Sequence, residues 1–353
     1  IALKYCPNIG ENIIKKLIST FNSAQNAWFS APKELLSVSK VGEKTIQFIG
    51  NESILKKAEK EIQYCKDHQI QITHLWDESY PSLLKECADA PVLLYSKGNF
   101  DWKIPALSIV GTRKMTSYGK QFTEELVECL KGKNINIISG LALGIDGTAH
   151  KKAVELQIPT IGVLAHGLNN LYPSQHQLLA NEMMSKGGII SEFSLDAKPD
   201  RPNFIQRNRI IAGLSPITVI VESGYGGGAI STIKFANSYH REVFALPGKI
   251  TDPSSQGCNR LIQNLEAQII TRPDDILDFL GEKIEKQTQP QLFPELTLQE
   301  TELITYLKEK GKSQIDILAW ELGKPAYQLM PVLLELELKN IIKPLPGKYF
   351  DLL

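Results

Sequence analysis

The sequence predicts an α/β protein whose core is a parallel sheet with helices on both faces. Short apolar runs rich in β-branched residues alternate with amphipathic stretches between residues 106 and 270. Each run is about five residues long, the usual length of a buried strand. Glycine or charged residues follow several of these runs, as they do at the ligand-binding edge of such sheets. The six expected strands are 106–110, 135–139, 159–164, 188–191, 216–221 and 242–246.

Residues 1–66 are expected to form a separate helical domain, which leaves 67–281 for the sheet domain. Residues 7–17 and 38–49 each place a hairpin containing glycine before apolar residues at helical spacing. This pattern is compatible with paired helix-hairpin-helix units of the SAM-like kind, whose glycine amides often hold a DNA backbone. A small helical packing domain also explains it and is favoured, because each hairpin has only one glycine.

The C-terminal part predicts a linker and a small domain. Residues 282–295 are polar, contain prolines and have no periodicity, so they are expected to be a linker. Residues 296–353 carry three helical patterns and a hairpin pattern, which is typical of a winged helix with Pro325 at the start of its third helix. The helical patterns cover about 299–310, 313–322 and 325–338. Residues 326–337 contain two glutamates and no lysine or arginine, which favours a protein contact or a degenerate role over the reading of DNA sequence.

Composition excludes several classes of protein. With 42% apolar and 22% charged residues, the 353-residue chain has an ordinary folded composition. Lysine plus arginine equals aspartate plus glutamate at 39 each, so a site for a polyanion must be a local patch. No run approaches the ~20 apolar residues that span a bilayer, and the first segment lacks a secretory pattern, so a cytoplasmic protein without a membrane partner is expected. The five cysteines are far apart, and His166 and His176 have no companions at ligand spacing, so neither disulfides nor a metal site is expected.

Residues 139–150, SGLALGIDGTAH, form a glycine-spaced turn between an expected strand and an expected helix. Gly140, Gly144 and Gly147 allow close backbone approach, so N–H groups and a helix N-terminus can point at an anion. The turn therefore predicts a phosphate cradle, with Asp146 as the helix cap. It lacks the GK[ST] of an NTPase loop, and no acidic residue stands where it would bind a ribose, so no nucleotide cofactor is expected.

Two further segments supply positive charge. Arg113 follows the first expected strand, where its guanidinium could fork onto a phosphate or tie loops together. Between residues 198 and 209, four cations oppose Asp200 alone, a local net charge of +3 that favours phosphates as ligand. Phe204 lies three residues after Arg201, so a base could stack on its ring, although a core position is an open alternative. Together these segments indicate a polynucleotide.

These motifs resemble the DNA-processing protein A family (DprA or Smf) of bacterial natural transformation. The resemblance covers nearly the whole chain and rests on IVGTR at 109–113 with Tyr118 and Gly119, the turn at 139–150, GVLAHGLNNLYP at 162–173, Ser191 with Glu192, Phe204 with RNRIIAGLS at 207–215, ALPG at 245–248, and Gly257 with Asn259, Leu261 and Ile262. It implies an extended Rossmann-like core that binds single-stranded DNA, forms a homodimer and helps to load the RecA recombinase. It also implies a helical N-terminal domain and a winged-helix C-terminus.

Residue by residue, the resemblance assigns DNA contacts to three segments. The backbone phosphates would lie against Gly111, Thr112, Arg113, Ser139, Gly140, Gly144, Ile145 and Asp146. Arg201 and Phe204 would take the basic and base-stacking positions, and Arg207, Asn208 and Arg209 match an RNR motif. The expected protein is a non-enzymatic recombination mediator that protects the incoming strand and has no catalytic residue, metal or cofactor.

Two alternatives remain at this stage. A nucleotide N-glycoside-cleaving enzyme with a related crevice could use Glu192 or Glu222 to activate water. The PGGxGT loop of such enzymes is lacking, because residues 224–228 read GYGGG. A scaffold that recruits recombination proteins through residues 296–353 is compatible with the mediator.

Overall fold

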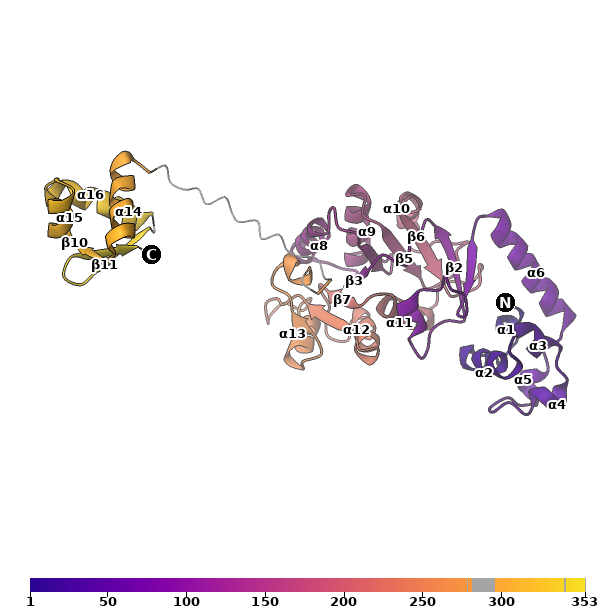
Figure 1. Ribbon diagram of the computed structural model, residues 1–353. Coiled ribbons are helices and arrows are strands. Elements are labelled where there is room, and N and C mark those ends of the chain that lie inside the picture. Colours follow the sequence, from indigo (N-terminus) through magenta and orange to yellow (C-terminus); the bar gives the residue numbers. More distant parts are fainter. Residues whose placement is uncertain (278, 281–295, 340, 353) are drawn as a thin grey trace. The chain divides into compact units, whose positions relative to one another are not determined.

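The computed structural model describes residues 1–277, 279–280, 296–339 and 341–352. The chain divides into two compact units, residues 1–283 and 284–353 (Figure 1). The predicted linker, 282–295, lies outside the described residues. The boundary predicted at residue 66 falls inside the first unit and stays a prediction.

The first unit begins with the expected helical region. Gly10 and Gly42, the hairpin glycines, are the N-caps of α2 and α5, where a glycine is well tolerated. The apolar faces of these helices enclose a core that includes Leu17 and Trp28 and is shared with Val92 and Leu93, next to and within the sheet. The helices are α1 (Ala2–Tyr5), α2 (Glu11–Phe21), α3 (Ala24–Phe29), α4 (Pro32–Leu35), α5 (Glu43–Ile46) and α6 (Glu52–Asp67).

The sheet has nine strands in the order β1-β2-β6-β5-β4-β3-β7-β8-β9. The strands are β1 (Gln71–His74), β2 (Leu93–Gly98), β3 (Ala106–Val110), β4 (Asn136–Ser139), β5 (Thr160–Leu164), β6 (Gly187–Ser191), β7 (Ile217–Ile220), β8 (Glu242–Ala245) and β9 (Gln268–Ile269). The six expected strands are confirmed as β3 to β8, and they pair in parallel. The prediction missed β1 and β2, which pair antiparallel at one edge, and the two-residue strand β9, which pairs in parallel with β8 at the other edge. β1 buries one side chain, that of Thr73, so it has no continuous apolar run.

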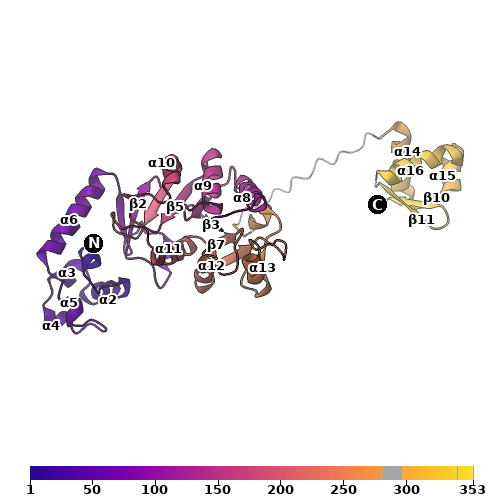
Figure 2. The same cartoon turned by 180° about the vertical axis from the view of Figure 1, so that it is seen from behind.

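Helices cover both faces of this sheet, as expected (Figures 1 and 2). One layer contains α8 (Ser117–Cys129), α9 (Ile145–Glu155) and α10 (Gln177–Met183), and the other contains α7 (Ser82–Lys85), α11 (Arg201–Leu214) and α12 (Ala229–Ser238). The short helix α13 (Gln256–Gln263) packs on β8. The 3-10 turns η1 and η2 occupy Ser174–His176 and Pro273–Ile276.

The strand order creates a topological switch beside β3. From β3 the chain moves to β4 on one side and later returns to β7 on the other side. Loops that follow β3 and β7 therefore diverge at the carboxyl edge of the sheet, which is where open α/β sheets place their ligands.

The second unit is the expected winged helix. Its helices are α14 (Leu298–Lys310), α15 (Ile315–Glu321) and α16 (Ala326–Leu338), and its strands are β10 (Ser313–Gln314), β11 (Ile342–Leu345) and β12 (Tyr349–Leu352). The predicted hairpin pairs β11 with β12, and Leu303, Leu318 and Leu333 lie in the core between helices and sheet. Within the described parts of both units, no helix is long and apolar enough to cross a membrane.

Candidate nucleic-acid interface

The glycine turn between β4 and α9 packs against the segment that follows β3. Gly144 has a φ of +80°, and a Cβ added there would lie 2.2 Å from the carbonyl oxygen of Thr112. The amide of Ile145 donates to that same oxygen at 3.2 Å. Glycine alone combines this φ with so close an approach. The turn and residues 111–113, which are separate in sequence, consequently form one wall.

Arg207 donates hydrogen bonds to the backbone of the glycine turn. The side chain of Arg207 is buried, and its Nη1 donates to the carbonyl oxygens of Gly140, at 2.7 Å, and Val163. Burial lowers the pKa of Arg207 to about 10, and the nearby Asp146 opposes this shift. The guanidinium therefore remains charged at neutral pH.

Asp146 lies inside the first turn of α9, whereas the N-cap of this helix is Gly144. The predicted capping position was therefore wrong by two residues. The carboxylate accepts a hydrogen bond from the amide of Ala142 at 3.4 Å, and burial raises the pKa of Asp146 against the opposing charge of Arg207. His150, on the same helix, bonds to Thr160 at 2.7 Å.

A groove of about 880 Å³ opens at the carboxyl edge of the sheet. Its lining includes residues 111–113 after β3, the glycine loop after β7 with the start of α12, and residues of α11. The N-terminus of α12 enters at Gly228 and Ala229, where helix geometry favours an anion.

Phe204, on α11, is surrounded by aromatic and cationic groups in this groove. The guanidinium carbons of Arg113 and Arg207 lie 5.0 Å and 5.9 Å from its ring centroid. Tyr172 approaches the ring edge-on, with the two ring centroids 6.0 Å apart. The Phe204 side chain is only partly buried, so part of it remains accessible to a ligand.

The groove carries a local positive charge in a chain with a formal net charge of zero. Four cations line it, Arg113, Arg201, Arg207 and Lys234, against the two carboxylates Asp146 and Asp200, which gives +4 − 2 = +2. Arg113, Arg201 and Lys234 are exposed. A cleft of about 830 Å³ among the N-terminal helices has mostly apolar walls instead.

Asn208 connects the two helices that border the groove. Its Nδ2 donates to Ser231 Oγ at 2.7 Å and to the carbonyl oxygen of Gly228 at 3.3 Å. The start of α12 is thereby fixed relative to α11, which carries Phe204.

The structure brings most of the predicted site residues together. The groove is lined by Gly111, Thr112, Arg113, Asp146, Arg201, Phe204, Arg207 and Asn208. Ser139, Gly140, Gly144 and Ile145 lie in or before the turn behind this lining, and Ser139 and Ile145 are fully buried. The direct phosphate contacts assigned to these four residues stay predictions.

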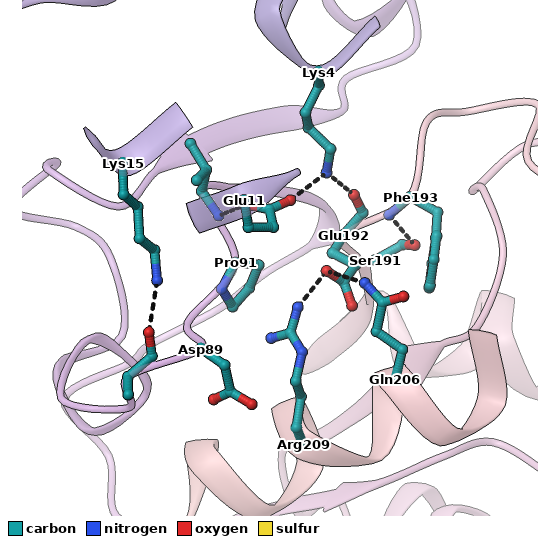
Figure 3. A network of polar contacts seen from close by, with 12 residues as sticks. Lys4, Glu11, Lys15, Asp89, Pro91, Ser191, Glu192, Phe193, Gln206 and Arg209 are labelled. Atoms are coloured by element: carbon teal, nitrogen blue, oxygen red, sulfur yellow. Dashed lines mark hydrogen bonds and ion pairs between the residues drawn. The ribbon is translucent and has the colours of Figure 1, made fainter. Parts of the chain in front are cut away.

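Arg209 lies outside the groove. Its side chain is 7% exposed, and its Nη2 donates to Glu192 Oε2 at 2.5 Å (Figure 3). The RNR pattern suggested equal roles for Arg207 and Arg209. They differ because residues two apart on a helix point in directions about 200° apart.

Sequence reasoning missed Tyr172, Ser231 and Lys234 as site residues. Tyr172 appeared only as part of a longer motif, and Lys234 lies within an ordinary helical pattern. No local pattern reports that these residues line the groove, because the groove brings together segments that are far apart in the chain.

The two carboxylates that an enzyme could use do not line the groove. Glu192 bonds to Arg209 and Gln206, and Glu222 accepts hydrogen bonds from the amide and hydroxyl of Thr116. Both side chains are buried. Among the residues that the structure describes, no group of three or more His, Cys, Asp or Glu could hold a metal ion.

Two family models match the chain. The model described as DNA recombination-mediator protein A matches residues 71–281, and the model described as DprA winged helix domain matches residues 287–348. The first covers the sheet and the groove, and the second covers most of the winged helix.

Relatives that cover most of the chain agree with these models. The chain is 36% identical to Protein Smf of Escherichia coli strain K12, over 78% of this chain and 75% of that protein. The X-ray structure of DNA processing protein A from Streptococcus pneumoniae matches 78% of this chain and 95% of its own, at 30% identity and a TM-score of 0.66. A Helicobacter pylori structure, titled for the single-stranded DNA binding mode of its DNA processing protein A, matches 60% and 96%, at 28% identity and a TM-score of 0.54. The chain belongs to the DNA recombination-mediator protein A family, also called DprA or Smf.

Proposed function

We propose that this chain binds single-stranded DNA in the groove over α11 and acts as a recombination mediator in DNA uptake. The observation that carries the proposal is the accessible ring of Phe204 between Arg113 and Arg207. A base can stack on the ring while the exposed guanidinium of Arg113 holds a phosphate, a combination typical of proteins that bind single strands.

The groove offers phosphates several kinds of partner. Arg113, Arg201 and Lys234 are exposed cations, and the start of α12 contributes backbone amides and the positive end of a helix dipole. Such contacts carry no sequence code, because every nucleotide has a phosphate and every base has a π-face. Sequence preference should be weak and affinity should depend strongly on salt.

The relatives support this assignment. The Helicobacter pylori protein is described as binding single-stranded DNA. A relative is named DNA processing protein DprA, and the matching family model is described as a recombination mediator. Family membership also supports loading of the RecA recombinase onto the incoming strand and homodimer formation. We include both in the proposal as expectations for this chain.

An N-glycosidase activity is not part of the proposal. Both candidate bases are engaged with protein groups, Glu192 with Arg209 and Glu222 with Thr116. The check is incubation with nucleoside monophosphates and analysis for free base. Release of free base by the original chain that is lost in Glu192→Gln would show that the protein is an enzyme and would refute the mediator proposal.

The decisive experiment is an anisotropy titration of fluorescent single-stranded and duplex oligonucleotides at several salt concentrations. Tight, salt-sensitive binding that favours the single strand supports the proposal. Equal binding to both forms would move the DNA contact to the helical region or the winged helix. No binding to either form would refute it.

A further inference from the structure

One side of helix α11 faces the groove, and another side contacts Glu192 at the end of β6. Phe204 and Asn208 lie on the side that faces the groove. Gln206 and Arg209 lie roughly 100–200° away around the helix axis, at 100° per residue, and both contact Glu192. The helix that carries the stacking residue is therefore held from its far side.

Glu192 is the attachment point. It directly follows strand β6, so the rigid sheet fixes its backbone. Its Oε2 accepts hydrogen bonds from Arg209 Nη2 at 2.5 Å and from Gln206 Nε2 at 3.2 Å (Figure 3). Because residues 206 and 209 are three apart, one carboxylate binds two positions on the same helix face. Both ends of the ion pair are almost fully buried.

The N-terminal helices join the same network. Lys4 of α1 donates to the backbone carbonyl of Glu192 and pairs with Glu11 Oε1 at 3.4 Å (Figure 3). Glu11 Oε2 in turn accepts from the amide of Val92 at 2.6 Å. A continuous set of polar contacts thus runs from α1 and α2 through the end of β6 to α11.

We propose that Glu192 and Arg209 are positioning residues, whose ion pair sets the orientation of α11 and so keeps Phe204 and Asn208 directed into the groove. Lys4 extends this support to the N-terminal helices. The inference rests on the proposed function, because it assigns the pair an effect on binding of single-stranded DNA. It also gives Arg209 a role that needs no contact with a phosphate.

The physical basis is the cost of a buried charge without its partner. Removing either side chain leaves the other charged group buried, and the structure relaxes to solvate it. The element free to move is α11, because Glu192 is held through its backbone by β6. Rotation of α11 by a small angle would move the Phe204 ring away from Arg113, which belongs to a different segment.

Two substitutions in the full-length chain separate positioning from direct contact. Arg209→Met should lower the affinity for a fluorescent oligothymidylate about tenfold, with an unchanged slope of log affinity against log salt because no phosphate contact is lost. Glu192→Gln should also lower the affinity. Simple electrostatics predicts the opposite, since this change removes a negative charge near a polyanion. Arg272→Met is the matched control, because Arg272 is exposed and pairs locally with Asp275.

Two further measurements complete the test: the affinity of a double variant and the hydrogen exchange of individual helices. The double variant Glu192→Gln/Arg209→Met should lose no more affinity than Arg209→Met alone, because both changes disrupt one interaction. Hydrogen exchange should accelerate in residues 201–214 and stay unchanged in residues 117–129, which form α8 in the other helix layer. If Arg209→Met does not fold, Glu192→Gln and Lys4→Met carry the same test, with a smaller effect for Lys4→Met because its side chain is nearer the surface.

Three results would overturn the inference: a reduced salt slope in Arg209→Met alone, additive losses in the double variant, or unchanged affinity and exchange in both single variants. If the unmodified chain binds no single-stranded DNA, the proposed function fails. Hydrogen exchange of 201–214 then still decides whether the pair positions α11.

Discussion

Arg113 lies over the ring of Phe204, with its guanidinium carbon 5.0 Å from the ring centroid. These residues are 91 positions apart in the sequence and come from the loop after β3 and from α11. Their contact joins a cation that can hold a phosphate to a ring that can stack on a base. The distance is within the range of cation–π attraction, so the two side chains hold each other in place before DNA arrives.

Phe204→Leu should weaken binding of single-stranded DNA by about 1–3 kcal/mol, the usual contribution of one stacked base. The salt slope should not change, because no cation is removed. Phe204→Tyr should retain most of the affinity since the ring remains. Anisotropy titration at several salt concentrations measures the affinity of each variant and the salt slope of Phe204→Leu.

The control for this prediction is Phe29→Leu. Phe29 is an exposed phenylalanine of α3 that does not line the groove, and its replacement should have no effect. Equal losses at both positions, or none at Phe204, would contradict the stacking role.

Arg113→Ala should lower the affinity for every sequence and reduce the magnitude of the salt slope by about 0.7 for one lost phosphate contact. The reason is that fewer counterions are released when one cation is missing. Titration of mixed and homopolymeric strands at several salt concentrations measures both effects.

Arg272→Ala removes an exposed arginine whose local partner is Asp275 and is the matched control. Unchanged affinity and slope in Arg113→Ala would count against the groove as the DNA site. An altered sequence preference would indicate a base contact instead of a phosphate contact.

The central sheet was predictable because buried parallel strands are short apolar runs with clear ends. Strands β3 to β8 follow this rule. β1 escapes it, because this antiparallel edge strand buries only one side chain, that of Thr73. β2 was missed although it lies inside the sheet and buries four consecutive residues, Leu93 to Ser96. The winged helix was predictable from three helical periods and a hairpin.

The site was predictable only in part. Glycines and arginines at strand ends indicated a phosphate ligand, and the structure places Arg113, Arg201 and Phe204 in one groove. The sequence did not distinguish Arg207 from Arg209, because the direction of a helix face depends on packing. Tyr172 and Lys234 reach the groove through long-range contacts that no local pattern contains.

Gly144→Ala should destabilise the first unit by more than the about 1–2 kcal/mol that a left-handed residue with a Cβ costs, because Gly144, at φ +80° and ψ −130°, lies outside the left-handed helical region. The added Cβ would lie 2.2 Å from the carbonyl oxygen of Thr112, so the backbone at 112 and 113 must move. Affinity for single-stranded DNA should fall together with stability, because Arg113 moves with this backbone.

Gly132→Ala is a close control, because Gly132 has a φ of +77° and no heavy atom within 4 Å of the added Cβ. Its free energy of unfolding should fall only by the conformational cost of the Cβ, and its affinity for single-stranded DNA should not change. Denaturant unfolding compares the two variants. Equal free energies of unfolding would show that the contact with Thr112 relaxes without cost.

Acid should destabilise the first unit through His150. Burial, with the nearby His176 and Arg207, lowers the pKa of His150 from 6.5 to about 3. The unfolded chain therefore binds a proton near pH 6.5 that the folded chain excludes, so stability is complete above pH 6.5 and falls as the pH drops toward 3. At pH 5.5 the loss from this residue should be about 1.4 kcal/mol.

The measurement is the free energy of unfolding at pH 7.5 and 5.5 for the original chain and for His150→Leu. Because leucine does not titrate, the variant should lose about 1.4 kcal/mol less over this interval, whatever its stability at pH 7.5. An equal loss in both proteins would mean that His150 is protonated in the folded state.

Deletion of residues 296–353 should leave the affinity for single-stranded DNA nearly unchanged. The winged helix forms a unit of its own, and α16, in the position of a recognition helix, carries two glutamates and no lysine or arginine. Such a helix repels phosphates and lacks the side chains that usually read guanine. Instead, α16 exposes Tyr327, Leu334 and Leu338, which suits contact with protein.

The comparison uses the full chain and a chain that stops at residue 295, titrated with the same single-stranded and duplex oligonucleotides. Affinities that agree within about twofold, well below the tenfold that corresponds to 1.4 kcal/mol, confirm the expected division of labour. A large loss for the single strand would make the winged helix part of the DNA site. A loss of affinity for duplex DNA alone would show that the winged helix binds double-stranded DNA despite the acidic α16. Lys343 and Lys348, at the hairpin, would then be the cations to replace next.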